Sequence, residues 1–283
     1  MRRFDRFAAI DWSGAKGSGH PGIAIALCEA GSAAPALVPP PGRHWSRSDV
    51  ADWLEAQNGA LLAGLDFSFA PPWIERRSYL PGEDVPDRAT AFWSHVEASC
   101  DDADLGAASF LEARYRRHFY FGAADGEKRG FMHLRQCEAR FNAGGGGKPS
   151  TVYDAIGAAQ VAKASFAGMR LLNRVSQRLS VWPFHPVPPD GPMLVEIYTS
   201  IAARAAGLPR GRSKIRDAET LDAALAVLGS RPHCRLERYS DHATDAILTA
   251  AWLRANAHRP EYWNPAALDP VIAATEGWTF GVV

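Results

Sequence analysis

The first 72 residues alternate short apolar runs with turns, which predicts a small sheet, a helix and one further strand. Residues 6–11 and 22–28 are apolar and flank a glycine-rich segment, so they predict a β-hairpin. A third strand is expected near residues 36–38. Residues 46–57 have apolar positions at helical spacing, and residues 61–67 form an apolar run closed by two prolines, which predicts a buried strand.

A long segment, residues 73–189, then interrupts the strand pattern, and we expect it to be a mostly helical insertion. Its clearest helix is predicted over residues 151–179, because Thr151 and Asp154 have the spacing of a capping box.

After the insertion, residues 193–198 alternate as a strand, and three helices follow: a short one ending near residue 207, one over residues 221–228 and one over residues 241–257. Strands and helices mixed in this way are typical of the α/β class. The sequence therefore predicts a single domain over residues 1–283, whose core is formed by residues 1–72 and 190–283.

The composition is that of a folded globular protein without a membrane-spanning segment. Of 283 residues, 47% are hydrophobic, and 31 Lys and Arg balance 31 Asp and Glu to a net charge of 0, which excludes a protein that coats nucleic acid indiscriminately. The mean hydropathy is −0.19, no apolar stretch approaches 18 residues, and the start lacks a signal-peptide core. We therefore expect a cytoplasmic protein with no membrane partner.

Charge is segregated along the chain although it cancels in total. Residues 49–104 contain twelve acidic and three basic residues, whereas residues 110–178 contain twelve basic and five acidic residues. This asymmetry indicates one anionic face and one face suited to an anionic partner, although two ordinary solvated surfaces would look the same.

Two apolar strands end in the same pattern, an aspartate followed by an aromatic residue and a serine. Asp11 ends the first predicted strand and Asp66 ends the fourth. If these strands are neighbours, the two carboxylates lie side by side and repel each other unless a cation lies between them. Oxygen ligands without a nearby cysteine suit Mg²⁺ or Mn²⁺ better than zinc.

Three further residues are candidates for the same site. Glu196 stands within the strand at residues 193–198, on the face that it shares with Leu194, and needs a buried partner if a helix covers that face. His242 and Asp245 are three positions apart and therefore share a face of the last helix. Asp241 has a structural role available as the N-cap of that helix.

These features resemble the ribonuclease H-like superfamily, and in particular the bacterial predicted-nuclease family called domain of unknown function 429. The final motif, with His242, Asp245 and Ala246, also resembles that of RuvC-type Holliday-junction resolvases. The resemblance spans nearly the whole chain through five short motifs: Ala9 to Gly14, Gly64 to Asp66, Val195 to Tyr198, His242 to Ala251, and Glu276 to Trp278. Thr199 departs from the family pattern, which often has proline there.

The resemblance implies a ribonuclease H-like fold with a mixed five-stranded sheet, acids on the first and fourth strands and last ligands on a late helix. In such a fold two Mg²⁺ ions activate water and stabilise the leaving oxygen of a phosphodiester. Carried over by position, Asp11, Asp66 and Asp245 would be metal ligands. His242 would be a ligand or general base, and Glu196 a further ligand or base.

A nuclease also needs basic groups that neutralise phosphates, and two groups are candidates for binding nucleic acid. Lys163, Arg170, Arg174 and Arg178 fall on one face of the helix predicted over residues 151–179. Arg116 and Arg117 are interleaved with aromatic residues that could stack on unpaired bases. An ordinary amphipathic helix with a basic outer face would give the same pattern.

Three functions are compatible with these residues. The leading hypothesis is a metal-dependent nuclease that hydrolyses DNA or RNA. The second is a nucleotide-binding phosphotransferase of the related actin-like fold, because residues 11–16 could approach a nucleotide phosphate. The third is a non-catalytic nucleic-acid or protein adaptor that has kept the fold.

Overall fold

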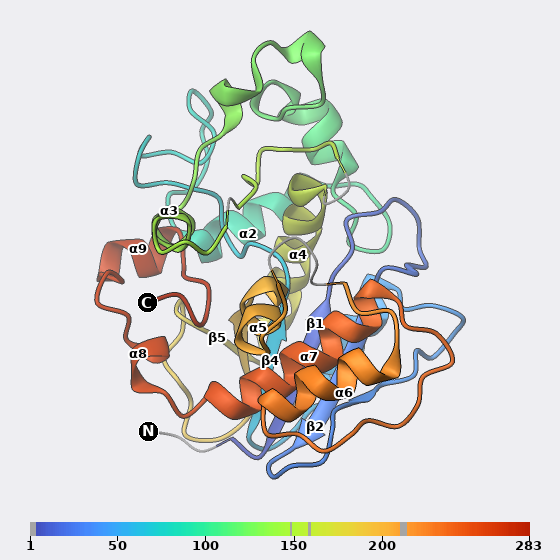
Figure 1. Ribbon diagram of the computed structural model, residues 1–283. Coiled ribbons are helices and arrows are strands. Elements are labelled where there is room, and N and C mark those ends of the chain that lie inside the picture. Colours follow the sequence, from blue (N-terminus) through green and yellow to red (C-terminus); the bar gives the residue numbers. More distant parts are fainter. Residues whose placement is uncertain (1–3, 148, 158–159, 210–213) are drawn as a thin grey trace.

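A six-stranded mixed sheet forms the centre of the molecule (Figure 1). The computed structural model describes residues 4–147, 149–157, 160–209 and 214–283. In spatial order the strands are β3 (Ala36–Leu37), β2 (Ala24–Glu29), β1 (Arg6–Asp11), β4 (Leu61–Leu65), β6 (Met193–Glu196) and β5 (Ser180–Val181). β2 is antiparallel to β1 and β3, and the remaining pairs are parallel.

Helices cover both faces of this sheet. One face packs against α1 (Arg47–Glu55), α2 (Ala89–Ala98) and α4 (Val161–Val175), and the other against α5 (Thr199–Ala205), α6 (Ala218–Val227) and α7 (Asp241–Asn256). The remaining helices are α3 (Gln136–Ala143), α8 (Pro260–Trp263) and α9 (Pro270–Thr275), with short helical turns at Ser109–Arg114, Arg116–His118, Ala123–Asp125 and Lys128–Phe131. Across the described ranges no helix combines the length and apolar character needed to cross a bilayer.

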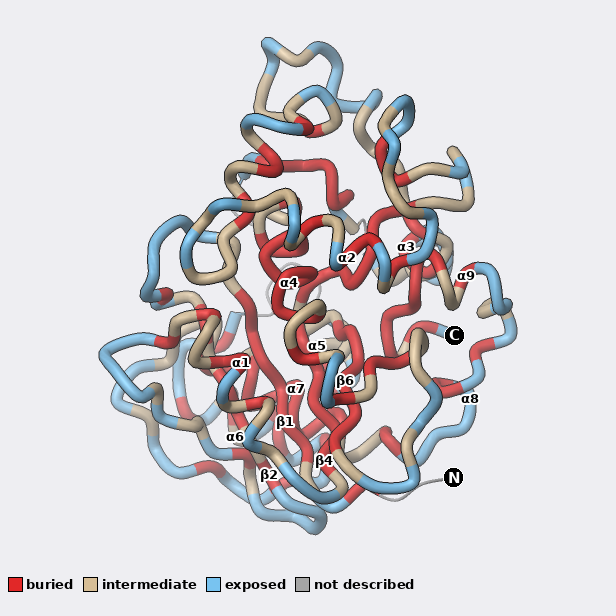
Figure 2. The backbone as a smooth tube through the Cα atoms, turned by 180° about the vertical axis from the view of Figure 1, so that it is seen from behind, coloured by how far each residue is buried: buried red, intermediate tan, exposed pale blue. Residues whose placement is uncertain are grey.

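Alternate residues of each central strand enter opposite layers of the core. In β1, Ala8 and Ile10 pack in the layer beneath α1 and α4, whereas Phe7 and Ala9 pack in the layer beneath α7. Figure 2 shows β1 and β4 buried, whereas the outer loops are exposed. Because side chains alternate along a strand, a residue's position in the sequence decides which layer it enters.

The α/β class, the hairpin and most of the predicted elements are confirmed. The helix predicted over residues 46–57 is α1, where Ser46 caps the amino end by accepting a hydrogen bond from the amide of Asp49. The helix predicted over residues 241–257 is α7, whose cap is Ser240. The expectation that Asp241 could be the cap is therefore wrong.

The sheet and the insertion differ from the expectation in two ways. The sheet has six strands rather than five, because β5 comes from the end of the segment predicted as insertion and pairs with β6. Long irregular stretches join the helices of residues 73–189, so this segment is less helical than predicted.

The helix predicted to open at Thr151 begins ten residues later, at Val161. The two capping side chains are used in tertiary contacts: the Thr151 hydroxyl donates to the His133 carbonyl at 2.7 Å, and Asp154 pairs with Lys128 at 2.6 Å. Residue 154 also forms an isolated β-bridge with Tyr120. These contacts hold residues 151–154 in a turn, in which the Asp154 amide donates to the Thr151 carbonyl at 3.1 Å, so the local capping pattern does not start a helix.

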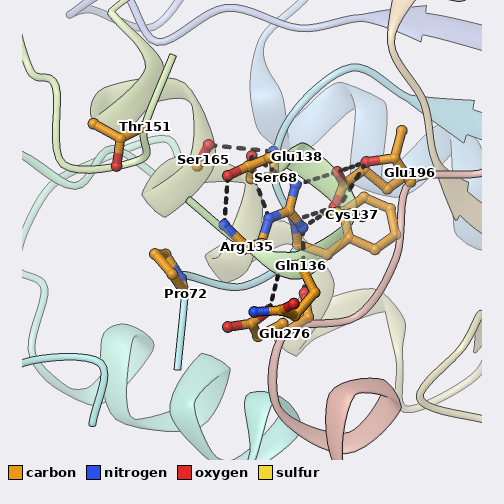
Figure 3. A network of polar contacts seen from close by, with 12 residues as sticks. Ser68, Pro72, Arg135, Gln136, Cys137, Glu138, Thr151, Ser165, Glu196 and Glu276 are labelled. Atoms are coloured by element: carbon orange, nitrogen blue, oxygen red, sulfur yellow. Dashed lines mark hydrogen bonds and ion pairs between the residues drawn. The ribbon is translucent and has the colours of Figure 1, made fainter. Parts of the chain in front are cut away.

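A buried arginine joins the insertion to the sheet. Arg135 lies immediately before α3, and Figure 3 shows it in contact with Ser68, Glu138 and Glu196. Its two terminal nitrogens reach the two carboxylate oxygens of Glu196 at 2.5 and 2.7 Å, and its Nε donates to Glu138 at 2.9 Å. All three side chains are fully buried. The pairing is bidentate, which is the strongest geometry for an arginine and a carboxylate.

A second buried acid ties the carboxy-terminal segment to the same network. Glu276 accepts hydrogen bonds from the amides of Trp73, Ile74 and Gln136 at 2.7 to 2.8 Å. Its own backbone carbonyl accepts a bond from Arg135. The insertion, β6 and the end of the chain therefore meet around one guanidinium.

We predict that Arg135→Met lowers the free energy of unfolding by about 3–5 kcal/mol, because it leaves Glu138 and Glu196 buried without a cation. Chemical denaturation at pH 7 measures this loss. Arg178→Met is the matched control, since Arg178 is exposed, and it should leave the unfolding free energy unchanged. A loss under 1 kcal/mol for Arg135→Met would mean that the network does not hold the fold together.

Candidate active site

The two strand-end aspartates lie side by side at one edge of the sheet. The parallel register of β1 and β4 pairs Ile10 with Leu65, and the amide of Asp66 donates to the Ile10 carbonyl at 3.1 Å. Asp11 and Asp66 are the next residues in that register, and neighbouring strands are about 4.8 Å apart. The alternation that places Ala9 beneath α7 places Asp11 on the same side of the sheet.

The amino end of α7 brings two more titratable groups to this edge. His242 Nδ1 lies 3.1 Å from Asp11 Oδ1, and Asp245 follows one turn later on the same face. Gly64 in β4 allows the close approach of this helix, because a Cβ atom there would lie 3.0 Å from the side chain of Leu253 in α7. The helix and the two strands therefore position three carboxylates and a histidine together.

A cavity of about 760 Å³ contains these groups. It is bounded on one side by the sheet edge and α7, and on the other by the insertion, through Val161, Ala164 and Ser165 of α4 and the glycines at 146 and 147. The Trp12 indole donates to the Ala164 carbonyl at 3.0 Å and fixes α4 against the end of β1. The site residues that line the cavity are Asp11, Ser13, Asp66, Tyr198, Thr199, Ser200, Asp241, His242 and Asp245.

Burial and mutual repulsion make these carboxylates weak acids. Burial raises the pKa of Asp66 well above its usual value, and the charges of Asp11 and Asp245 raise it further. Burial, together with the charges of Asp11 and Asp241, raises the pKa of Asp245 to about 7. Burial also raises the pKa of Asp11, although its hydrogen bond with His242 opposes the shift. The same hydrogen bond raises the pKa of His242, so the ring donates to Asp11 when protonated.

In the described part of the chain, the basic side chain that bonds to one of the three aspartates is His242, which contacts Asp11. Among the described residues no ion pair joins a lysine or arginine to Asp11, Asp66 or Asp245. Asp241 differs, because it pairs with Lys214 at 2.6 Å and with Arg216. Over the same part of the chain, no three His, Cys, Asp or Glu side chains form a group that could hold a metal ion as they stand.

Glu196 does not belong to this site, which corrects the prediction of a catalytic role. It pairs with Leu65 in the sheet register, one position before Asp66, so its side chain points to the opposite face. There it is fully buried and bonded to Arg135, to the amide of Phe69 at 2.8 Å and to the hydroxyl of Thr279 at 2.6 Å. Glu196 is therefore a structural residue.

The predicted basic face of the insertion helix is largely occupied by intramolecular ion pairs. Arg170 is buried and binds Glu97 at 2.6 Å, and Arg174 pairs with Glu55 at 2.8 Å and with Asp52. These two arginines brace α4 against α2 and α1. The prediction that they bind nucleic acid is therefore not supported, because their guanidinium groups are already satisfied.

The other predicted basic residues are separated from one another. Lys163 is partly exposed beside a second cavity, whereas Arg178 lies beyond the end of α4 in an exposed turn. Arg116 pairs with Asp125 and Arg117 with Glu83, both at 2.7 Å, on the outer part of the insertion. The structure therefore does not assemble the six predicted bases into one surface.

Two functionally placed residues escaped the sequence analysis. Arg135 has no local pattern that marks it, because, apart from Glu138, its partners Glu196, Ser68 and Glu276 lie far away in the chain. Thr199, the position that departs from the family pattern, places its hydroxyl 3.5 Å from Asp66 Oδ2. A threonine where the family often has proline could have identified this residue from the sequence, because it places a hydroxyl group shortly after β6, beside the site.

Comparison of the chain with protein-family models, with curated proteins and with solved structures found no match in any of the three. The case for a function therefore rests on the geometry and charge of the site.

We predict that Asp245→Asn stabilises the metal-free protein at pH 8 by about 2 kcal/mol, a value that allows for screening by water. A carboxyl group with a raised folded-state pKa stabilises the fold below its unfolded-state pKa, and this contribution is lost as the pH rises through about 7. The extra stability of Asp245→Asn over the wild type should therefore vanish near pH 4. Denaturation in EDTA from pH 4 to pH 8 measures it.

Glu237→Gln is the control for this pH series, because Glu237 is an exposed acid outside the cavity. This variant should change the free energy of unfolding by the same small amount at pH 4 and at pH 8. If Asp245→Asn is no more stable than the wild type at pH 8, the repulsion among these carboxylates is not significant.

Proposed function

We propose that this protein is a divalent-metal-dependent nuclease that hydrolyses phosphodiester bonds at the cavity between the sheet edge, α7 and α4. The observation that carries the proposal is the contrast between two sets of buried acids. Glu196 has Arg135 as its counterion, whereas Asp11, Asp66 and Asp245 share a cavity without a lysine or arginine partner among the described residues. A bound cation would supply the missing positive charge.

The donor set fits Mg²⁺ or Mn²⁺. These cations take carboxylate oxygens as ligands, and no cysteine lines the cavity among the described residues. Asp11, Asp66 and Asp245 would hold the metal, which would oppose the burial and mutual repulsion that raise their pKa values. The bound metal would supply an activated water and stabilise the charge that develops on a phosphodiester.

The other residues of the cavity orient these groups. The contact between His242 Nδ1 and Asp11 orients the side chain of the acid, and the Thr199 hydroxyl donates to Asp66. Trp12 and α4 cover one side of the site and limit its contact with bulk water. In such surroundings charge interactions are stronger than in open solvent.

The topology also agrees with the arrangement implied by the resemblance to ribonuclease H-like proteins. The two neighbouring acids end the first and fourth strands, and the third lies on the last long helix. Fold alone permits other chemistry, so the support for a phosphodiester as substrate comes from the position of the three acids and not from the α/β class.

We predict that the purified protein cleaves single-stranded or duplex nucleic acid when Mn²⁺ is added. Asp11→Asn and Asp66→Asn should each lower the cleavage rate at least about 10³-fold, because each removes a negative ligand from the cation. Gel analysis of labelled DNA and RNA of linear and branched form measures cleavage. Asp190→Asn is the matched control, because Asp190 is an exposed acid that does not line the cavity, and this variant should retain full activity.

Calorimetry with Mn²⁺ separates the proposal from its alternatives. The wild type should bind Mn²⁺, and Asp66→Asn should bind it at least about tenfold more weakly. Failure to bind any divalent cation would favour a non-catalytic adaptor. Tight ATP binding without cleavage of any nucleic acid would favour the phosphotransferase.

A further inference from the structure

A second cavity, of about 460 Å³, lies next to the carboxylate cavity. Gly14 and Ala15 line both cavities. On the α4 side, Lys163 lines the second cavity and Ala164 the first. The contact between Gly14 and α4 therefore separates two adjoining sites, and a Cβ atom on Gly14 would lie only 2.4 Å from the Ala164 amide nitrogen.

Basic and very small residues line this second cavity. Its basic residues are Lys16, Arg47 and Lys163, and one acid, Asp102, accompanies them. The small residues are Gly14, Ala15, Gly17, Ala103, Gly106, Ala107 and Ala108. Small side chains leave the backbone accessible and keep the charged groups from being covered, which is typical of sites that receive an anionic group.

The positive charge of this cavity is only partly balanced. Lys16 Nζ lies 2.8 Å from one oxygen of Glu112, and Lys163 Nζ lies 3.8 Å from the other, so two ammonium groups share one carboxylate. Asp102 accepts hydrogen bonds from the amide and the hydroxyl of Ser109. The two ammonium groups therefore carry one positive charge more than the carboxylate that they share.

Arg47 contributes a buried charge and fixes the wall between the cavities. Arg47 is 2% exposed, and its guanidinium donates to the backbone carbonyls of Ser13, Ala15 and Asp104. The Asp104 carboxylate instead accepts from His20 and from the first amides of α1. Arg47 thus orients the strip at residues 13–15, which begins at the end of β1 beside Asp11.

We propose that the second cavity is a phosphate-binding subsite, in which Lys16 and Lys163 bind a phosphate of the substrate strand next to the one held at the carboxylate cavity. This inference rests on the proposed nuclease function in one respect: it takes the group in the carboxylate cavity to be a phosphodiester of the same strand. A phosphate placed here displaces Glu112 from the two ammonium groups, and Lys and phosphate form a favourable ion pair at this exposure. The substrate is then a strand of more than one nucleotide.

The test measures binding of a fluorescent single-stranded dT oligonucleotide by anisotropy, with Ca²⁺ present. Lys16→Ala/Lys163→Ala should bind at least tenfold more weakly than the wild type. The slope of log affinity against log salt should fall by about 0.7, because one phosphate contact is lost. Arg140→Ala/Arg178→Ala is the matched control: it removes two exposed charges outside both cavities and should change neither quantity.

Equal binding by the double lysine variant and the wild type would overturn the proposal, and so would absence of oligonucleotide binding by the wild type. Binding of inorganic phosphate or ATP in preference to the oligonucleotide, with the same dependence on the lysines, would overturn the assignment to a strand. Lysine-dependent binding without cleavage in Mn²⁺ would support the subsite and refute the nuclease function. The two proposals can therefore fail separately.

Discussion

The fold depends on one buried ion pair, between Arg135 and Glu196. Glu196 belongs to the central sheet and Arg135 to the insertion, so their contact decides where the insertion lies. An arginine in a fully buried position is tolerated only when its donors are satisfied. Here Glu138, the hydroxyl of Ser68 and the backbone of Glu276 complete the set. The position of the insertion in turn sets one wall of the carboxylate cavity.

The alternation of side chains along a strand decides which acids are structural and which are candidates for catalysis, because neighbouring positions face opposite sides of the sheet. Glu196 and Asp66 are only one register position apart in neighbouring strands, yet they point to opposite faces of the sheet. On one face the insertion supplies an arginine, and on the other α7 supplies a histidine and another aspartate. Acids of the same chemistry therefore lie in different surroundings, because one layer supplies a guanidinium and the other supplies a histidine and a further carboxylate.

The insertion helix α4 connects structure and site. Its basic residues Arg170 and Arg174 form ion pairs that hold it against α2 and α1, while its amino-terminal turns line both cavities. Lys163 lies in these amino-terminal turns and lines the second cavity. This division explains how a basic helix can contribute a single lysine to a binding site and use its other charges for packing.

Local patterns in the sequence determined the hairpin, α1, β4, α7 and the placing of Asp11 and Asp66 at strand ends, because alternation, caps and strand ends depend on neighbouring residues. His242 and Asp245 followed from helical spacing in the same way. The sequence left open whether the strands of Asp11 and Asp66 are neighbours, and the sheet decided it. Only the tertiary structure decided the role of Glu196, the late start of α4 and the burial of Arg170. Their partners Arg135, Tyr120 and Glu97 lie far away in the sequence. Such contacts exist only once the layers are packed, and the free energy of satisfying a buried charge then outweighs local propensity.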